Sequence, residues 1–196
     1  MIKNENSRFK QQQYILYPGD YIAVTENYIL TSVAGATVLV CLYDLKKRIG
    51  GMGHFIVPGT MGTKGIIADE IAKHGIQSME LLMGEIVKKG GDRRFLKAKL
   101  FGAGYIKESI PDMGGVQQSN IRFLHEYFAL EKITVVKEDL GGDARRKIYF
   151  FPLKGITFRK FQRRNEDSSE FIKMEKEYID NVFRNRNRAG RLVLFE

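Results

Sequence analysis

The sequence lacks the features that mark secreted and membrane proteins. Its one cysteine, Cys41, cannot form a disulfide within the chain, which excludes a disulfide scaffold and fits a reducing compartment. Residues 1–13 are polar and hold no apolar run, so we expect no secretory signal. The longest apolar stretch, residues 33–43, is too short to cross a bilayer. We therefore expect a protein that does not insert into a membrane.

Metal and phosphate motifs are also missing. The three histidines, His54, His74 and His125, stand without a paired cysteine spacing, so no metal site is predicted. The glycine run at residues 50–53 lacks the lysine and hydroxyl residue of a nucleotide loop. The sequence predicts no cofactor.

The composition itself is that of a folded soluble protein. The chain has 196 residues, 43% of them hydrophobic and 28% charged, which fits one domain with or without an appendage. Its net charge of +9 suggests an acidic partner, although a merely solvated basic surface is the alternative. The basic residues are spread along the chain and no nucleic-acid motif is present, so nucleic acid is not the partner we expect.

The hydrophobic pattern predicts an α+β layered domain. The segment 14–31 suggests short strands broken by a turn at Pro18-Gly19-Asp20, and residues 48–53 suggest a glycine loop. The other predicted elements are strands at 38–43, 54–57 and 95–101, helices at 66–89 and 119–130, and a hairpin of strands 133–138 and 147–151 around Gly141-Gly142-Asp143.

The C-terminal region reads as an appendage. Residues 167–187 predict a helix with an apolar stripe of Phe171, Met174, Tyr178 and Val182. We favour a helix docked on the core over a free helix that binds a partner. The predicted division is a polar N-terminal extension at 1–13, a main domain at 14–158 and a basic C-terminal extension at 159–196.

A few residues could carry chemistry. His54 follows the glycine loop and opens an apolar strand, which would let its ring face the turn before the strand at residue 38. The hydroxyls of Thr31, Ser32 and Thr37 could supply a nucleophile or an orienting group. The alternative is a core histidine beside ordinary strand-end residues, and the residues alone leave both open.

Five blocks of the chain resemble the bacterial chemotaxis protein family CheD, in the same order and at similar separations. That family reads L-G-S-C-V-x-V-x-L-x-D and then G-G-M-x-H-x-x-L-P. The resemblance covers about residues 14–158 and rests on Ala34–Asp44, Gly50–Pro58, Ala98–Gly104, Gly115 with Asn120, and Glu138–Gly142 with Arg146–Phe150.

The resemblance implies a fold and a function. The fold would be a layered α/β/β sandwich of mixed strands with two main helices, like the core of deamidating toxins. CheD proteins are cytoplasmic and convert selected glutamines of the chemoreceptor cytoplasmic domain to glutamates. They also bind the phosphatase CheC, so CheC is a possible second partner. Carried over by position, His54 and Thr31 are the family's histidine and threonine, and Phe101 belongs to a strand that contributes to CheC binding.

The chain departs from the family at the nucleophile. Thr37 stands where the family has its cysteine, and the following residues continue without a gap. Cys41 cannot take over, because four strand residues place it about 13 Å away, and it is expected in the core. A further alternative is an altered sequence whose parent carries the cysteine.

Two functions follow from this departure. One is a glutamine deamidase working slowly through Thr37 and His54, because a hydroxyl is far less acidic than a thiol. The other is a receptor- or CheC-binding regulator that has lost the chemistry. Hydrogen-bond reach between the two side chains in an open cleft would support the enzyme, and a filled cleft would rule it out.

Overall fold

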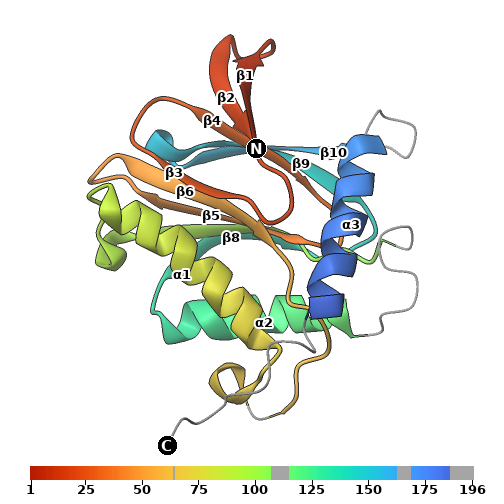
Figure 1. The fold of residues 1–196 in the computed structure, drawn as a ribbon. Coiled ribbons are helices and arrows are strands. Elements are labelled where there is room, and N and C mark those ends of the chain that lie inside the picture. The colour runs from red at the N-terminus through yellow and green to blue at the C-terminus, as the bar shows by residue number, and fades with distance from the viewer. Residues whose placement is uncertain (64, 107–114, 163–168, 186–196) are drawn as a thin grey trace, which may run out of the picture.

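The computed structural model describes residues 1–63, 65–106, 115–162 and 169–185 (Figure 1). The helices are α1 (Ala72–Lys88), α2 (Val116–Leu130) and α3 (Ser169–Asn185), with short 3-10 turns η1 (Ile66–Ala68), η2 (Arg93–Phe95) and η3 (Pro152–Lys154). The strands are β1 (Ile2–Asn6), β2 (Gln11–Ile15), β3 (Tyr21–Val24), β4 (Ile29–Ala34), β5 (Val38–Asp44), β6 (Ile49–Phe55), β7 (Lys97–Gly102), β8 (Thr134–Leu140), β9 (Arg145–Phe151) and β10 (Ile156–Gln162).

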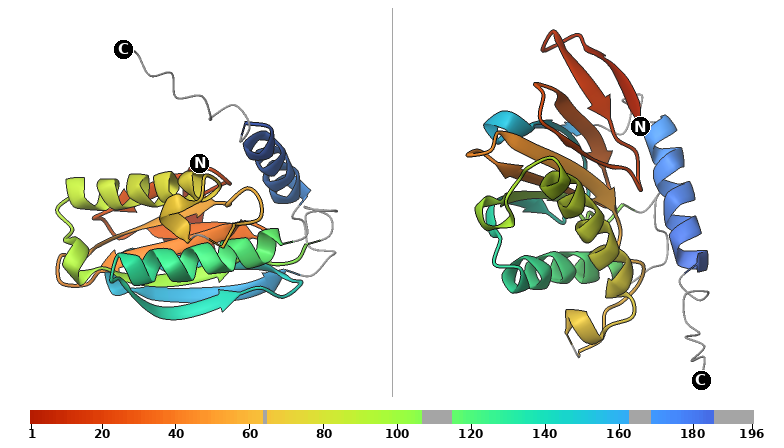
Figure 2. Two further views of the ribbon diagram at one scale, coloured as in Figure 1. Left: turned by 90° about the horizontal axis from the view of Figure 1, so that it is seen from below. Right: turned by 60° about the vertical axis from the view of Figure 1, so that its left-hand side comes forward.

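The strands form two five-stranded sheets stacked on one another. The first has the order β1-β2-β4-β9-β10 and the second the order β3-β6-β5-β7-β8. Helices α1 and α2 cover the outer face of the second sheet (Figure 2). This is the α/β/β layering that the resemblance implies and an α+β domain as the hydrophobic pattern predicts, so the fold class is confirmed.

Strand β5 lies at the centre of the second sheet, and all seven of its residues are buried. Side chains alternate between the faces of a strand. Val38, Val40 and Leu42 therefore pack under the helices, while Leu39, Cys41 and Tyr43 pack between the sheets. Cys41 is fully buried there, as expected, and burial raises the pKa of its thiol far above the ordinary range.

The predicted glycine loop at 48–53 is wrong, because residues 49–53 belong to strand β6 and only Arg48 lies in the turn before it. The strand runs between β3 and β5 beneath α1, and the space is tight. A Cβ on Gly50 would lie 2.6 Å from the Leu42 carbonyl oxygen, and one on Gly51 would lie 2.5 Å from that of Ile22. The glycines are required here by close approach and not by a turn.

The predicted hairpin of 133–138 with 147–151 is also wrong. Strand β8 pairs in parallel with β7 in the second sheet, while β9 lies between β4 and β10 in the first. Gly141 and Gly142 have φ of 78° and 71°, a region that favours glycine. The turn they form carries the chain from one sheet to the other.

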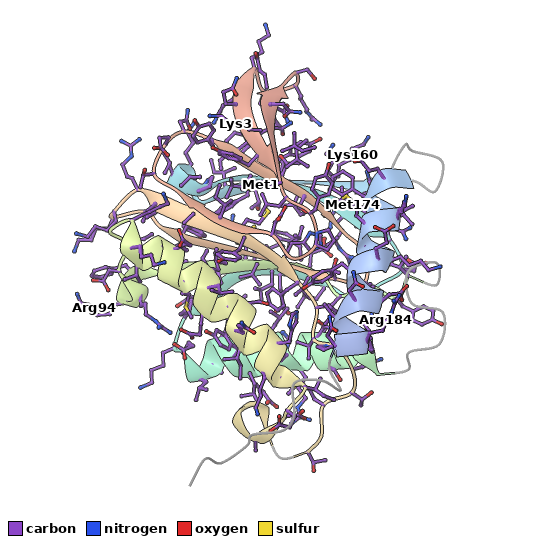
Figure 3. All side chains as sticks on the ribbon, viewed as in Figure 1. Met1, Lys3, Arg94, Lys160, Met174 and Arg184 are labelled. Carbon is purple, nitrogen blue, oxygen red and sulfur yellow. The ribbon has the colours of Figure 1, made fainter. Side chains whose placement is uncertain are left out.

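The elements run across both predicted domain boundaries. The N-terminal extension at 1–13 forms β1 and most of β2, and β10 continues to residue 162. Helix α3 lies along one side of the molecule beside the strand ends, and Figure 3 labels its Met174 and Arg184. Its Ile179 is buried, so the docked helix is confirmed. Within the described residues, no helix is both long and apolar enough to cross a membrane.

Candidate active site

The structure brings two of the predicted site residues together. Thr37 ends the short turn that joins β4 of the first sheet to β5 of the second, and His54 is near the end of β6. Thr37 Oγ1 lies 2.6 Å from His54 Nε2. Both side chains are buried, at 0% and 1% exposure. The hydroxyl and the imidazole are within the reach that a nucleophile and its base need.

Ser32 holds the other ring nitrogen of His54. Its hydroxyl donates to the Leu16 carbonyl at 2.7 Å, which leaves its oxygen free to accept, and this oxygen lies 2.9 Å from His54 Nδ1. The contact is satisfied when Nδ1 carries the proton. The lone pair of a neutral ring is then on Nε2, facing Thr37.

Thr31 is not brought to His54. Strand β4 alternates, so Ser32 faces the second sheet and Thr31 faces the outer side of the first. The Thr31 hydroxyl donates to Gln13 Oε1 at 2.9 Å, and Gln13 Oε1 also accepts from Asn6 Nδ2. The orienting place next to His54 belongs to Ser32.

Burial controls the charge of His54. Desolvation penalises the imidazolium and lowers the pKa of His54 to about 3. The ring is therefore neutral near pH 7, with Nε2 available as a proton acceptor. A general base has to be in this form.

An acidic side chain from α3 fills the space in front of this pair. One oxygen of Glu175, Oε1, accepts from the main-chain N–H of Gly35 at 3.0 Å and of Thr37 at 3.1 Å. The same oxygen lies 2.7 Å from Thr37 Oγ1. The second oxygen, Oε2, lies 4.0 Å from Arg145 Nε. Glu175 is 3% exposed, so its carboxyl group is held inside the protein.

The protons in this cluster can be counted. The Thr37 hydroxyl has one hydrogen but two short polar contacts, to His54 Nε2 and to Glu175 Oε1. It can donate to only one of them, and the other contact needs a proton on its partner. With Glu175 docked, the Thr37 hydrogen therefore serves either the imidazole or the carboxylate, and not both.

Gly35 makes room for the Glu175 carboxyl group. A Cβ at position 35 would lie 2.8 Å from Glu175 Oε2, which is closer than real Cβ contacts come. The turn is fixed from behind, since the carbonyls of Gly35 and Thr37 accept from the N–H groups of Gly104 and Ala103, both at 2.8 Å. The motif at 98–104 thus supports the turn that carries Thr37.

The cleft is not open. Thr37 and His54 are within hydrogen-bond reach, as the enzymatic interpretation requires, but Glu175 fills the space in front of them. What fills it is a side chain of α3, from the predicted C-terminal extension, and not the sandwich itself. A cavity of about 220 Å³ lies beside His54, and its wall includes His74 of α1 and Tyr178 of α3.

The remaining candidates lie away from this cluster. Phe101 on β7 is 3% exposed and packs between the two sheets, so its side chain presents no surface to a partner. Across the part of the chain that the structure describes, no three of the residues histidine, cysteine, aspartate and glutamate gather as metal ligands would.

Sequence reasoning missed Glu175 as a site residue and left Ser32 without a distinct role. Leu30 and Ala34 are apolar residues that face the second sheet, and period-two alternation places Ser32 on the same face. Glu175 is four residues after Phe171 and four before Ile179, so it is an acid within the apolar stripe of the helix. A charge in that stripe was the available signal.

Comparison with known proteins gives one consistent result. The family model described as CheD chemotactic sensory transduction matches residues 57–160, a range that begins after His54 and ends before α3. A probable chemoreceptor glutamine deamidase CheD 1 of Shewanella oneidensis is 36% identical over 148 residues, covering 76% of this chain and 71% of the relative. Proteins named probable chemoreceptor glutamine deamidase CheD from Paraburkholderia xenovorans and Thiobacillus denitrificans are 33% and 32% identical, covering 83% and 92% of this chain and 65% and 88% of their own lengths. Together with the layered fold, these matches show that the chain belongs to the CheD family.

Proposed function

We propose that this chain is a chemoreceptor glutamine deamidase in which Thr37 acts as the nucleophile and His54 as the base. The observation that carries the proposal is the 2.6 Å contact between Thr37 Oγ1 and His54 Nε2. The imidazole ring is held in this position by Ser32, whose oxygen contacts Nδ1. The names of the relatives supply the substrate class, a glutamine of a chemoreceptor. We propose the cytoplasm as the place of the reaction.

The first half of the reaction forms an acyl-enzyme. The Thr37 oxygen attacks the amide carbon of glutamine while its proton passes to His54 Nε2. The negative charge that develops on the amide oxygen is stabilised by the N–H groups of Gly35 and Thr37, which already hold an oxygen at 3.0 and 3.1 Å. The C–N bond then breaks, and the leaving nitrogen takes the proton back from His54 and departs as ammonia.

The second half releases the product. Water loses a proton to His54 and attacks the ester carbon, and Thr37 regains its hydrogen as the ester bond breaks. Glutamine and water have then become glutamate and ammonia. Ser32 keeps the ring in place through both halves, because its oxygen contacts Nδ1 while its hydrogen is held by the Leu16 carbonyl.

Threonine makes the first half slow. A hydroxyl is far less acidic than a thiol, and a histidine base contributes only about 100- to 10,000-fold. The threonine methyl group also crowds the attack. We expect a deamidase with low turnover whose rate rises when Thr37 is replaced by cysteine.

The test is the conversion of glutamine to glutamate in a receptor cytoplasmic fragment, measured by mass spectrometry. The chain as it stands, Thr37→Cys and His54→Gln are compared. Conversion by the first that is lost in the last supports Thr37 as a working nucleophile. No conversion by either the chain or Thr37→Cys, with the fold intact, would contradict the proposal.

A receptor-binding regulator is the second candidate, and a specific observation favours it. The residue at the nucleophile position is a threonine, and a carboxyl group of the same chain fills the site. Conversion by Thr37→Cys alone, together with receptor binding by both forms, would support this role. Binding to CheC belongs to the same candidate and is measured with purified CheC.

A further inference from the structure

The side chain that occupies the site is chemically the product of the proposed reaction. Deamidation of glutamine yields glutamate, and Glu175 is a glutamate. Its Oε1 accepts hydrogen bonds from the N–H groups of Gly35 and Thr37 and from the Thr37 hydroxyl. Donors at about 2.7 to 3.1 Å are what an oxyanion site requires. Glu175 thus takes the place that a receptor glutamate would take just after the reaction.

We propose that α3 is a built-in product mimic that keeps the site closed, so that a receptor helix must displace it before a glutamine can enter. This inference rests on the proposed function, because it takes the Gly35–Thr37 turn as the place of reaction. The displaced helix and the entering helix then compete for one surface.

The surface beneath α3 is built for a helix with one apolar face. Ile179 packs with Ala36, Ile56 and Val116, directly beside the turn that carries Thr37. The rings of Phe171 and Tyr17 lie 5.1 Å apart. These contacts lie on both sides of Glu175 along the helix.

Tyr178 adds a polar contact to this surface. Its hydroxyl lies 3.1 Å from His74 Nε2 on α1, and its ring comes within 3.1 Å of the position a Cβ would have on Gly19. The opposite side of α3 is solvent-facing, with Lys173, Lys176 and Glu177 exposed. A competing helix therefore needs glutamine at the position of Glu175 and apolar residues four before it and three and four after it.

The contacts that hold α3 on the sandwich are of a kind that allows the helix to be displaced from the site. In the described part of the chain, no hydrogen bond between two main-chain atoms joins α3 to the sandwich, so the helix is held through its side chains. Its deepest residues include an acid, and burying a carboxyl group opposes docking unless its partners compensate. A helix held in this way is displaced at less cost than a strand of either sheet.

A catalytic role for Glu175 is the alternative, and the two make opposite predictions. If Glu175 assisted the chemistry, Glu175→Ala would lose activity. If Glu175 is a product mimic, Glu175→Ala opens the site and raises both receptor affinity and conversion rate. Glu177→Ala is the matched control, because it removes the same residue type from the exposed side of the same helix.

The first experiment measures binding, which does not depend on the chemistry. Affinity for a receptor cytoplasmic fragment is compared among the unchanged chain, Glu175→Ala, Ile179→Asp and Glu177→Ala. We expect Glu175→Ala and Ile179→Asp to bind the receptor fragment about tenfold more tightly or better, since apparent affinity scales with the fraction of molecules whose site is open. Circular dichroism and hydrogen exchange confirm that the sandwich stays folded while α3 loses protection. Unchanged affinity in both variants, with α3 released, would overturn the inference.

The second experiment turns the mimic into a substrate. In Thr37→Cys with Glu175→Gln, a glutamine is presented to the cysteine within the same molecule, and we expect it to become glutamate without any receptor. The C–N bond of the introduced side-chain amide breaks, water supplies the new oxygen and ammonia leaves. Peptide mass spectrometry locates the change at position 175, and the same double variant with His54→Gln added is the control.

The outcomes separate this inference from the proposed function. Conversion of receptor glutamine by Thr37→Cys, with position 175 unconverted and affinity unchanged in Glu175→Ala, sinks the product mimic but leaves the deamidase. Conversion of nothing, with tighter receptor binding in Glu175→Ala and Ile179→Asp, sinks the deamidase and leaves α3 as the segment that closes the receptor site.

Discussion

Helices α1 and α3 have the same length but different relations to the core. Six residues of α1 are buried, among them Met79, Leu82, Met83 and Ile86, and the helix packs mainly on β3 and β6. In α3, the described residues that are buried are Ile179 and Glu175, one apolar and one acidic. Apolar burial drives folding, whereas a buried acid needs a specific set of partners. The comparison indicates that α1 stabilises the fold, whereas α3 is placed by its contacts with the candidate site.

The largest expected effect separates the two helices by stability. Leu82→Ala in α1 should lower the free energy of unfolding by about 2–5 kcal/mol, because it leaves a cavity beneath Gly51 and Gly53. Ile179→Ala in α3 should change the main denaturant transition by far less, since α3 can leave while the sandwich stays folded. Equal losses for the two variants would show that α3 is an integral part of the fold.

A second effect concerns how the free energy of unfolding depends on pH through His54, which lies beneath α3. The pKa of His54 is about 3 in the folded chain, because of burial, against about 6.5 when unfolded. The unfolded chain therefore binds more protons between these values, and His54 contributes stability that is complete above pH 6.5 and lost as the pH falls toward 3. Denaturant titrations across this range should show a weaker pH dependence in His54→Gln than in the unchanged chain. The same slope in both would mean that His54 is not buried as a neutral ring.

A third effect concerns Gly35, whose lack of a side chain leaves room for the Glu175 carboxyl group of α3. Gly35→Ala should expel the Glu175 carboxyl group and expose α3 to hydrogen exchange, because the new Cβ falls 2.8 Å from Glu175 Oε2. The same methyl group blocks a glutamine carboxamide, so receptor conversion should fall rather than rise, in contrast to Glu175→Ala. An α3 that stays protected in Gly35→Ala would contradict the close approach.

The smallest expected effect comes from the outer side of α3. Glu177 is exposed and pairs with Lys173 at 3.9 Å. Exposed pairs of this kind contribute about 0.5 kcal/mol or less, so Glu177→Ala should leave stability and receptor affinity nearly unchanged. A large effect on affinity would mean that the outer face of α3 also contacts the receptor.

The parts of the fold that could be predicted are those with local patterns. The hydrophobic pattern correctly predicted the strand at 38–43, which is β5, and the helix at 119–130, which is α2. The helix predicted at 66–89 begins later, because residues 66–68 form the 3-10 turn η1 and α1 starts at Ala72. The glycines of β6 misled because glycine marks both turns and close packing, and only the positions of β3, β5 and α1 decide between them.

The site was predictable to the extent that it depends on local register. Thr37 and His54 could be paired from the motif, while Ser32 required the alternation of β4 to be followed through Leu30 and Ala34. The contact of Thr37 with Glu175 joins residues 138 positions apart and depends on how α3 crosses the sandwich. No local pattern specifies such a pairing, although an acid within an apolar stripe points to one.

Because α3 belongs to the same chain as the site that it fills, its advantage over a receptor in this competition does not depend on the amount of protein. A tethered ligand acts as if present at an effective concentration on the order of millimolar, whatever the amount of protein. A receptor helix at a lower concentration competes poorly with α3, whereas one at a higher local concentration displaces it. Competition with the 17-residue helix α3 would then set a minimum local concentration of receptor below which the site stays closed. The protein would respond to the local density of receptors as well as to their sequence.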